Sequence, residues 1–244
     1  MPDFPLYAIG DIHGQIDMLN AAIALIQDDG GADANIVFLG DLVDRGPGSR
    51  EVIDLLQQGQ SAGRPWTVLS GNHDRMFADF LSSGRIDHPR ILSGISWENP
   101  RLGGLETLAS YGVNAIDMPV EHLWAAAQEA VPARHLAFLN NLPTYHEVED
   151  LLFVHAGIAP GVPLQMQTAE DMMWIRGPFL THTKPHPWLV VHGHTAVDQA
   201  EHQGNRVNLD SGAGYGRPIT AAVFESGQVW TLKPGGRQAL RPVV

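Results

Sequence analysis

The chain has 244 residues, 44% of them hydrophobic, which is enough for one large domain with a sizeable core. Acidic residues outnumber basic ones by 27 to 15, the formal net charge is −12, and the basic residues form no patch, which argues against nucleic-acid and anionic-membrane partners. There is no cysteine, so disulfides and thiolate chemistry are excluded and any metal must be held by nitrogen and oxygen atoms.

The first eighty residues alternate between apolar runs of strand length and segments with helical spacing. One helix is predicted from apolar residues that repeat at helical spacing, namely Ile16, Leu19, Ile23 and Ile26. A second helix is predicted after an N-cap at Ser49. Strands are predicted at 6–9, 36–39 and 67–69. Because βαβ crossovers are right-handed and make parallel neighbours, the residues after each strand should meet at one edge of a sheet.

The middle of the chain is less regular than its two ends. Trp97, Pro100 and a glycine pair interrupt any long periodicity, and helices are predicted near 121–130 and after Pro132. We therefore predict one catalytic domain, residues 1–244, with an insertion or cap over its active face at about 84–141. A second, mostly β layer is expected from apolar runs at 151–154, 188–191, 206–209, 219–224 and 228–232.

Five short polar clusters directly follow predicted strands, at residues 10–14, 40–46, 71–74, 155–157 and 192–195. Asp11 and His13, two positions apart in an extended segment, point to the same side and can hold one ion together. Asp41 is placed between the other strands and is the candidate bridge to a second ion. The ligands predicted to complete that second ion are Asn72, His155 and His194. His192 has the opposite strand parity and is assigned a supporting role.

The blocks Gly10-Asp11-Ile12-His13-Gly14, Gly40 to Gly46 and Gly71-Asn72-His73 match, in order, the patterns GDxHG, GDxVDRG and GNH. With them the chain resembles the metallophosphoesterases, and more closely the bacterial and phage-type members of the phosphoprotein (serine/threonine) phosphatase family. The resemblance implies an α/β fold of the calcineurin-like kind: a two-layered mixed β-sheet sandwich flanked by helices (αββα). It also implies a serine/threonine protein phosphatase that hydrolyses phosphomonoesters by in-line attack of a metal-bridging hydroxide.

The same resemblance implies a role for each matching residue. Two divalent ions, manganese in the first place and otherwise iron, zinc or cobalt, would be bound. The first would be held by Asp11, His13 and Asp41, and the second by Asp41, Asn72, His155 and His194. His73 would be the general acid, oriented by Asp44. The phosphate would be bound by Arg45, by Arg176 of the segment Met173-Trp174-Ile175-Arg176, and by Asn72.

Two other functions fit the same residues. The segments Asp44 to Ser49 and His155 to Ile158 also look like the symmetrical diadenosine tetraphosphate hydrolases. The substrate expected of a protein phosphatase is a phosphorylated protein or peptide. The alternative substrate, expected of a diadenosine tetraphosphate hydrolase, is a dinucleoside polyphosphate. The other function is that of a noncatalytic metal-binding scaffold. Such a scaffold would tolerate the loss of a metal ligand or of the general acid, but the sequence retains all of these residues, which argues against it. With no signal-peptide pattern at the start and no apolar run of membrane-spanning length, we expect a cytoplasmic enzyme with no membrane partner.

Overall fold

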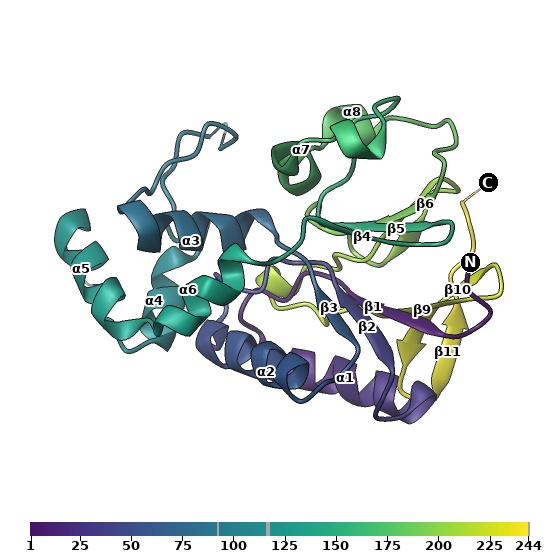
Figure 1. Ribbon diagram of the computed structural model, residues 1–244, viewed down its shortest axis with the longest axis horizontal. Coiled ribbons are helices and arrows are strands. Elements are labelled where there is room, and N and C mark those ends of the chain that lie inside the picture. Colours follow the sequence, from purple (N-terminus) through teal and green to yellow (C-terminus); the bar gives the residue numbers. More distant parts are fainter. Residues whose placement is uncertain (92, 116–117, 244) are drawn as a thin grey trace.

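In the computed structural model, which describes residues 1–91, 93–115 and 118–243, two β-sheets stack face to face between layers of helices (Figure 1). Positions 92, 116 and 117 of the predicted insertion lie outside the described residues. The first sheet has the strand order β11-β10-β9-β1-β2-β3. Its strands are β1 (Leu6–Ile9), β2 (Asn35–Phe38), β3 (Trp66–Val68), β9 (Ala221–Glu225), β10 (Gln228–Lys233) and β11 (Gly236–Ala239).

Strand β1 shows why this sheet is covered on both faces. Its side chains alternate, so that Leu6 and Ala8 belong to the core between the sheets while Tyr7 and Ile9 belong to the core under the helices. Strands β1, β2 and β3 are parallel, as predicted, and their connections are helices α1 (Ile16–Gly30) and α2 (Ser49–Ser61). The predicted Ser49 N-cap is wrong, because Gly48 occupies the cap position and Ser49 is the first helical residue.

The second sheet has the order β4-β5-β6-β8-β7 and packs its inner face on the first. Its outer face is covered by the short helices α7 (Ala169–Trp174) and α8 (Gly177–Leu180), through side chains such as Met172 and Phe179. The fold is therefore the αββα sandwich expected from the sequence. The strands are β4 (Tyr145–Val148), β5 (Leu151–Val154), β6 (Leu189–His192), β7 (Glu201–His202) and β8 (Arg206–Asn208).

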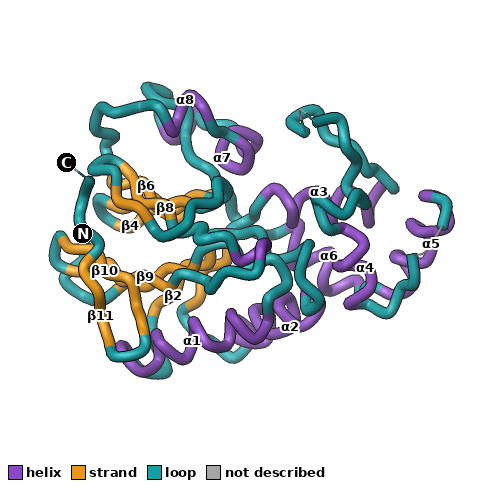
Figure 2. Tube along the Cα trace, turned by 180° about the vertical axis from the view of Figure 1, so that it is seen from behind, coloured by secondary structure: helices purple, strands orange, loops and turns teal. Residues whose placement is uncertain are grey.

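Four helices form a lobe beside the sheets, seen from both sides in Figures 1 and 2. They are α3 (Asn72–Ser83), α4 (Gly104–Ser110), α5 (Val120–Ala130) and α6 (Ala133–Asn140). Trp97 is fully buried in the core of this lobe, next to the rings of Phe77 and Phe80. The described residues include no helix long and apolar enough to cross a membrane.

Candidate dinuclear metal site

The loops that follow β1, β2, β3 and β6 meet around a cavity of about 340 Å³ at the carboxyl edges of the two sheets. Backbone hydrogen bonds hold the first two loops together, because the amides of Ile12 and His13 both donate to the carbonyl of Asp41. The described residues that line the cavity are His13, Asp41, Arg45, Asn72, His73, Arg176, His194, Thr195, Ala196, Asp210, Tyr215 and Arg217. None of them comes from 84–141, so the described part of the predicted insertion does not roof this cavity.

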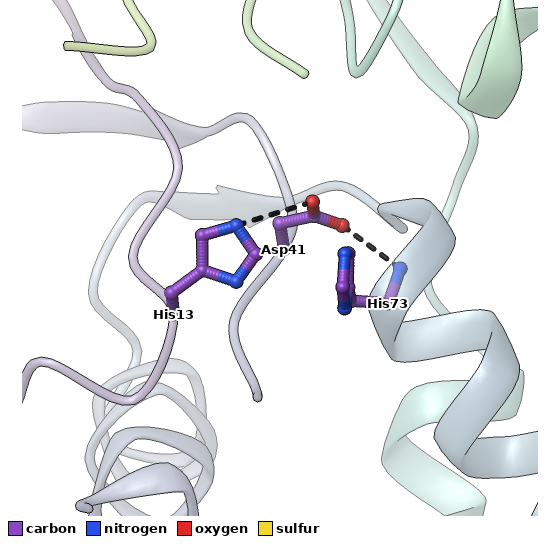
Figure 3. Close-up of side chains that lie close together, drawn as sticks. All are labelled: His13, Asp41 and His73. Carbon is purple, nitrogen blue, oxygen red and sulfur yellow. Dashed lines mark hydrogen bonds and ion pairs between the residues drawn. The ribbon is translucent and has the colours of Figure 1, made fainter. Parts of the chain in front are cut away.

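Asp41 is the centre of the constellation. Its carboxylate belongs to one group of potential ligand atoms with His13 and His73 (Figure 3), and to a second with His155 and His194. Within each group the atoms lie no more than 4.8 Å apart. The backbone amide of His73 donates to Oδ1 of Asp41 at 2.9 Å, which fixes the carboxylate between the two groups. This is the position that a bridging ligand requires.

The histidine rings are oriented by main-chain carbonyls. Nδ1 of His13 lies 2.9 Å from the carbonyl oxygen of Val43, and Nδ1 of His155 lies 2.8 Å from that of Leu39. A carbonyl only accepts, so each Nδ1 carries the proton and each Nε2 turns its lone pair toward the cavity. Burial also lowers the pKa of both imidazoles, and of His194, which keeps them in the neutral form that binds metals.

The donor set fits divalent metals. Nε2 of His194 is buried without a hydrogen-bond partner, while its Nδ1 lies 3.2 Å from Nε2 of His155. Two neutral ring nitrogens turned toward one another, with a carboxylate beside them, are better explained by a shared cation than by a hydrogen bond. A nitrogen and oxygen set of this kind suits manganese, iron, zinc or cobalt.

Asp11 is placed differently from the other predicted ligands. Both carboxylate oxygens of Asp11 accept from the backbone amide of His194, each at 3.1 Å, and Asp11 joins neither ligand group among the described residues. Burial raises the pKa of Asp11 well above its ordinary value, as does the nearby carboxylate of Asp210. Asn72 is in place, with Oδ1 3.0 Å from Nε2 of His155.

The predicted pair of His73 and Asp44 is formed, with 2.6 Å between Nδ1 and Oδ2. Sequence reasoning missed what holds Asp44. The indole of Trp97 donates to Oδ2 at 2.8 Å, and the hydroxyl of Thr107 donates to Oδ1 at 2.6 Å. Both partners belong to the lobe, and neither lies in a motif, so no local signal marked them.

Arginines supply the positive charge of the cavity. Arg45 reaches Nε2 of His13 at 2.8 Å and Nε2 of His73 at 3.2 Å, and its guanidinium lies over the ring of Tyr215. Arg176, which the sequence predicted, and Arg217, which it did not, line the same space. Burial lowers the pKa of Arg176.

Comparison with known proteins agrees with this geometry. The chain is 28% identical to the asymmetrical bis(5'-nucleosyl)-tetraphosphatase PrpE of Anoxybacillus flavithermus, over 96% of this chain and 97% of the relative. The Bacillus subtilis protein of the same name is 26% identical, over 96% and 98%. A solved structure described as a candidate diadenosine tetraphosphatase superposes with a TM-score of 0.67 at 21% identity, covering 95% of each chain.

The pattern of the calcineurin-like phosphoesterases matches residues 4–221, a range that contains the second sheet, strands β1, β2 and β3 of the first sheet, and every cavity residue named above. The fold, the order of the motifs and the paired ligand groups are those expected of a metal-dependent phosphoesterase. This chain belongs to the calcineurin-like phosphoesterase family.

Proposed function

We propose that this phosphoesterase hydrolyses dinucleoside tetraphosphates. The observation that carries the proposal is the presence of three guanidinium groups, those of Arg45, Arg176 and Arg217, around one small cavity. Two planar guanidiniums suffice for the oxygens of one phosphoryl group, whereas a third suits a chain of phosphates. The full-length relatives with tetraphosphatase names support the same substrate class. The protein phosphatase reading of the sequence becomes the second candidate.

Bound at the two ligand groups, a pair of divalent ions would supply a nucleophile from water and neutralise charge on the phosphoryl oxygens. In our proposal His13 and Asp41 would hold the first ion, and Asp11 would join them. Asn72, His155 and His194 share the second with Asp41. These six residues follow strands of both sheets, so the packing of the sandwich sets the spacing of the two ligand groups.

The remaining residues bind the substrate and move a proton. Nε2 of His73 faces the cavity while Asp44 holds its Nδ1, which is the arrangement of a general acid whose tautomer is fixed. Arg45 and Arg176 would bind the oxygens of the phosphoryl group under attack. With water as the nucleophile, one P–O–P bond is cleaved, and the proton goes to the leaving phosphate chain.

The bond that is cleaved distinguishes two versions of this function. The alternative that the sequence left open is a symmetrical hydrolase, which gives two molecules of ADP. The relatives are named asymmetrical, and by analogy we propose cleavage of diadenosine tetraphosphate and water to ATP and AMP. Chromatography of the nucleotide products separates these outcomes directly.

The second candidate, a serine/threonine protein phosphatase, rests on Arg176, which lines the cavity as the phage-type segment Trp174-Ile175-Arg176 implies. The test compares diadenosine tetraphosphate with a phosphoserine peptide, each with manganese added back after chelation. Manganese-dependent release of ATP and AMP with little peptide turnover is expected. Rapid phosphate release from the peptide alone would replace the proposed function with the second candidate.

A further inference from the structure

We infer that a second cavity, reached from the metal site past Arg217, binds the distal phosphates and nucleoside of a dinucleoside polyphosphate. This inference rests on the proposed function and names where the long arm of that substrate lies. The cavity has a volume of about 540 Å³, within the range of small-molecule sites. Arg217 lines both it and the metal cavity, so one side chain forms their common wall.

The cavity is built at the end of the sandwich, where the loop after β6 faces strands β10 and β11. One wall includes Asp198 and Gln199, and the other includes Lys233 and Gln238. Its floor holds the buried hydroxyl residues Ser211, Thr220 and Thr231. Amides and hydroxyls beside two cationic side chains are the groups expected to bind a ribose, a base edge and a phosphate chain.

The ion pair that holds Arg217 could be replaced by a contact with phosphate. Its Nη1 pairs with Asp198 at 2.5 Å, but the Asp198 side chain is 97% exposed, so this ion pair is weak in water. The Nε atom of Arg217 is buried without a hydrogen-bond partner. One phosphate oxygen could displace the Asp198 carboxylate from Nη1, and a second could satisfy Nε on the other edge of the guanidinium.

Lys233 supplies the second positive charge; it stands at the end of β10 and lines this cavity but not the metal cavity. A chain that begins at the metals would meet Arg217 first and Lys233 later. This order places most of the phosphates on one side of the bond under attack. The cavity therefore favours attack near one end of the tetraphosphate, which is the asymmetrical cleavage that yields ATP.

The test uses the two lysines of the sequence as a matched pair. Lys233→Glu reverses a charge in the cavity, whereas Lys184→Glu makes the same change at an exposed position that lines neither cavity. For each variant the kcat/KM for diadenosine tetraphosphate is divided by the kcat/KM for p-nitrophenyl phosphate, which is too short to reach Lys233. We expect this ratio to fall about tenfold or more in Lys233→Glu, through KM, and to stay within twofold in Lys184→Glu.

A second variant tests whether the volume of the second cavity, rather than the charge of Lys233, is needed to bind the substrate. Ala239→Trp, at an exposed position on β11, should fill the cavity and lower the same ratio. If the wild-type protein cleaves the dinucleotide but the ratio is unchanged in Lys233→Glu and Ala239→Trp, the inference is overturned and the proposed function stands. If the wild-type protein does not cleave the dinucleotide at all, both are overturned.

Discussion

Unusual backbone conformation is concentrated at the site residues. Five of them have positive φ although they are not glycine: His13 (51°), Asp41 (50°), Asp44 (72°), Arg45 (69°) and His194 (65°). This left-handed region costs an L-residue about 1–2 kcal/mol, so the surrounding contacts must hold each one there. Such strain concentrates where function fixes a side chain, and it supports the motif residues as the site.

The motifs predicted these residues, but they could not predict the ones that support them. Asp41 and Asn72 are marked by their place after a strand and next to glycine. Three further residues reach the same site from segments distant in sequence: Trp97, Thr107 and Arg217. The residues next to them in the sequence form no motif that would indicate this role. Only the folded chain shows that two of them hold Asp44 and that the third lines the cavity.

Replacing Asp41 should affect both ions at once. In Asp41→Asn a neutral amide takes the place of the carboxylate that both ligand groups share. A neutral oxygen bridges two cations poorly, so we expect the bound manganese to fall from two ions per chain toward none, measured by elemental analysis after gel filtration. Loss of one ion only, with the other tightly held, would show that Asp41 serves a single ion.

Replacing Asp44 should affect proton transfer. Asp44→Asn removes the charge that orients Nδ1 of His73, while metal content should be retained. On a series of phosphate esters with leaving groups of increasing pKa, we expect kcat to fall about 100-fold for alkyl esters and much less for p-nitrophenyl phosphate. A uniform loss along the series would contradict His73 as the acid.

At the level of elements, the sequence predicts buried strands better than exposed ones. The range of β5 is predicted to the residue, because all four of its side chains are buried and apolar. Strands β4 and β11 were not predicted, since β4 alternates between exposed and half-buried residues and β11 is exposed throughout. Their pairing with neighbours, not their own pattern, makes them strands.

Helix α3 begins with residues that also belong to the candidate site. Asn72 and His73 begin the helix, and Asp74 caps it, accepting from the amide of Gly71 at 2.9 Å. Asp74 also accepts from the amide of Leu42 at 2.8 Å, which ties the loop after β2 to this helix. The same polar cluster therefore starts a helix and contributes side chains to the cavity.

A contact between the lobe and α7 should steady the segment that carries Arg176. Arg90 binds Glu170 at 2.6 Å and Asp171 at 2.9 Å, and the ring of His88 stacks on that of Trp174. We expect Arg90→Ala to speed hydrogen exchange in α7 and to lower kcat/KM several-fold, with little change in melting temperature because the pairs are exposed.

Arg101→Ala is the matched control for this contact, since Arg101 lies on the exposed surface of the same lobe. It should leave hydrogen exchange in α7 as it is in the wild-type protein. Equal exchange in the wild type and in Arg90→Ala would show that α7 is held without the lobe.

At the scale of the whole molecule, the site depends on the packing of two sheets. Val37 and Leu39 of the first sheet share a core with Phe153 and Val191 of the second. The residues directly after these strands include Asp41, His155 and His194, so the core that joins the sheets also sets the distance between the ligand groups. The resemblance implied this layered arrangement, but hydrophobic patterning alone predicted only two sets of strands.

The end of the first sheet is fastened by one arginine, which gives a prediction for stability against pH. Arg237 of β11 pairs with Asp29 of α1 at 2.8 Å and with Glu225 of β9 at 2.5 Å. Hydrogen bonding to Arg237 lowers the pKa of Asp29, against the opposing effect of burial. A folded-state pKa below the unfolded value means that the stabilisation is present above about pH 4 and disappears as the pH falls through the folded value.

We therefore expect Arg237→Gln to lower the melting temperature by about 2–4 °C at pH 7, which corresponds to roughly 1 kcal/mol in a chain of this size. The deficit should shrink as the pH is lowered below 4, because the wild-type protein then loses the same ion pair. Arg241→Gln removes an equal charge from the exposed segment that follows β11 and serves as the control. A deficit as large at pH 3 as at pH 7 would mean that Arg237 stabilises the sheet through packing, for example on the ring of Trp230, and not through Asp29.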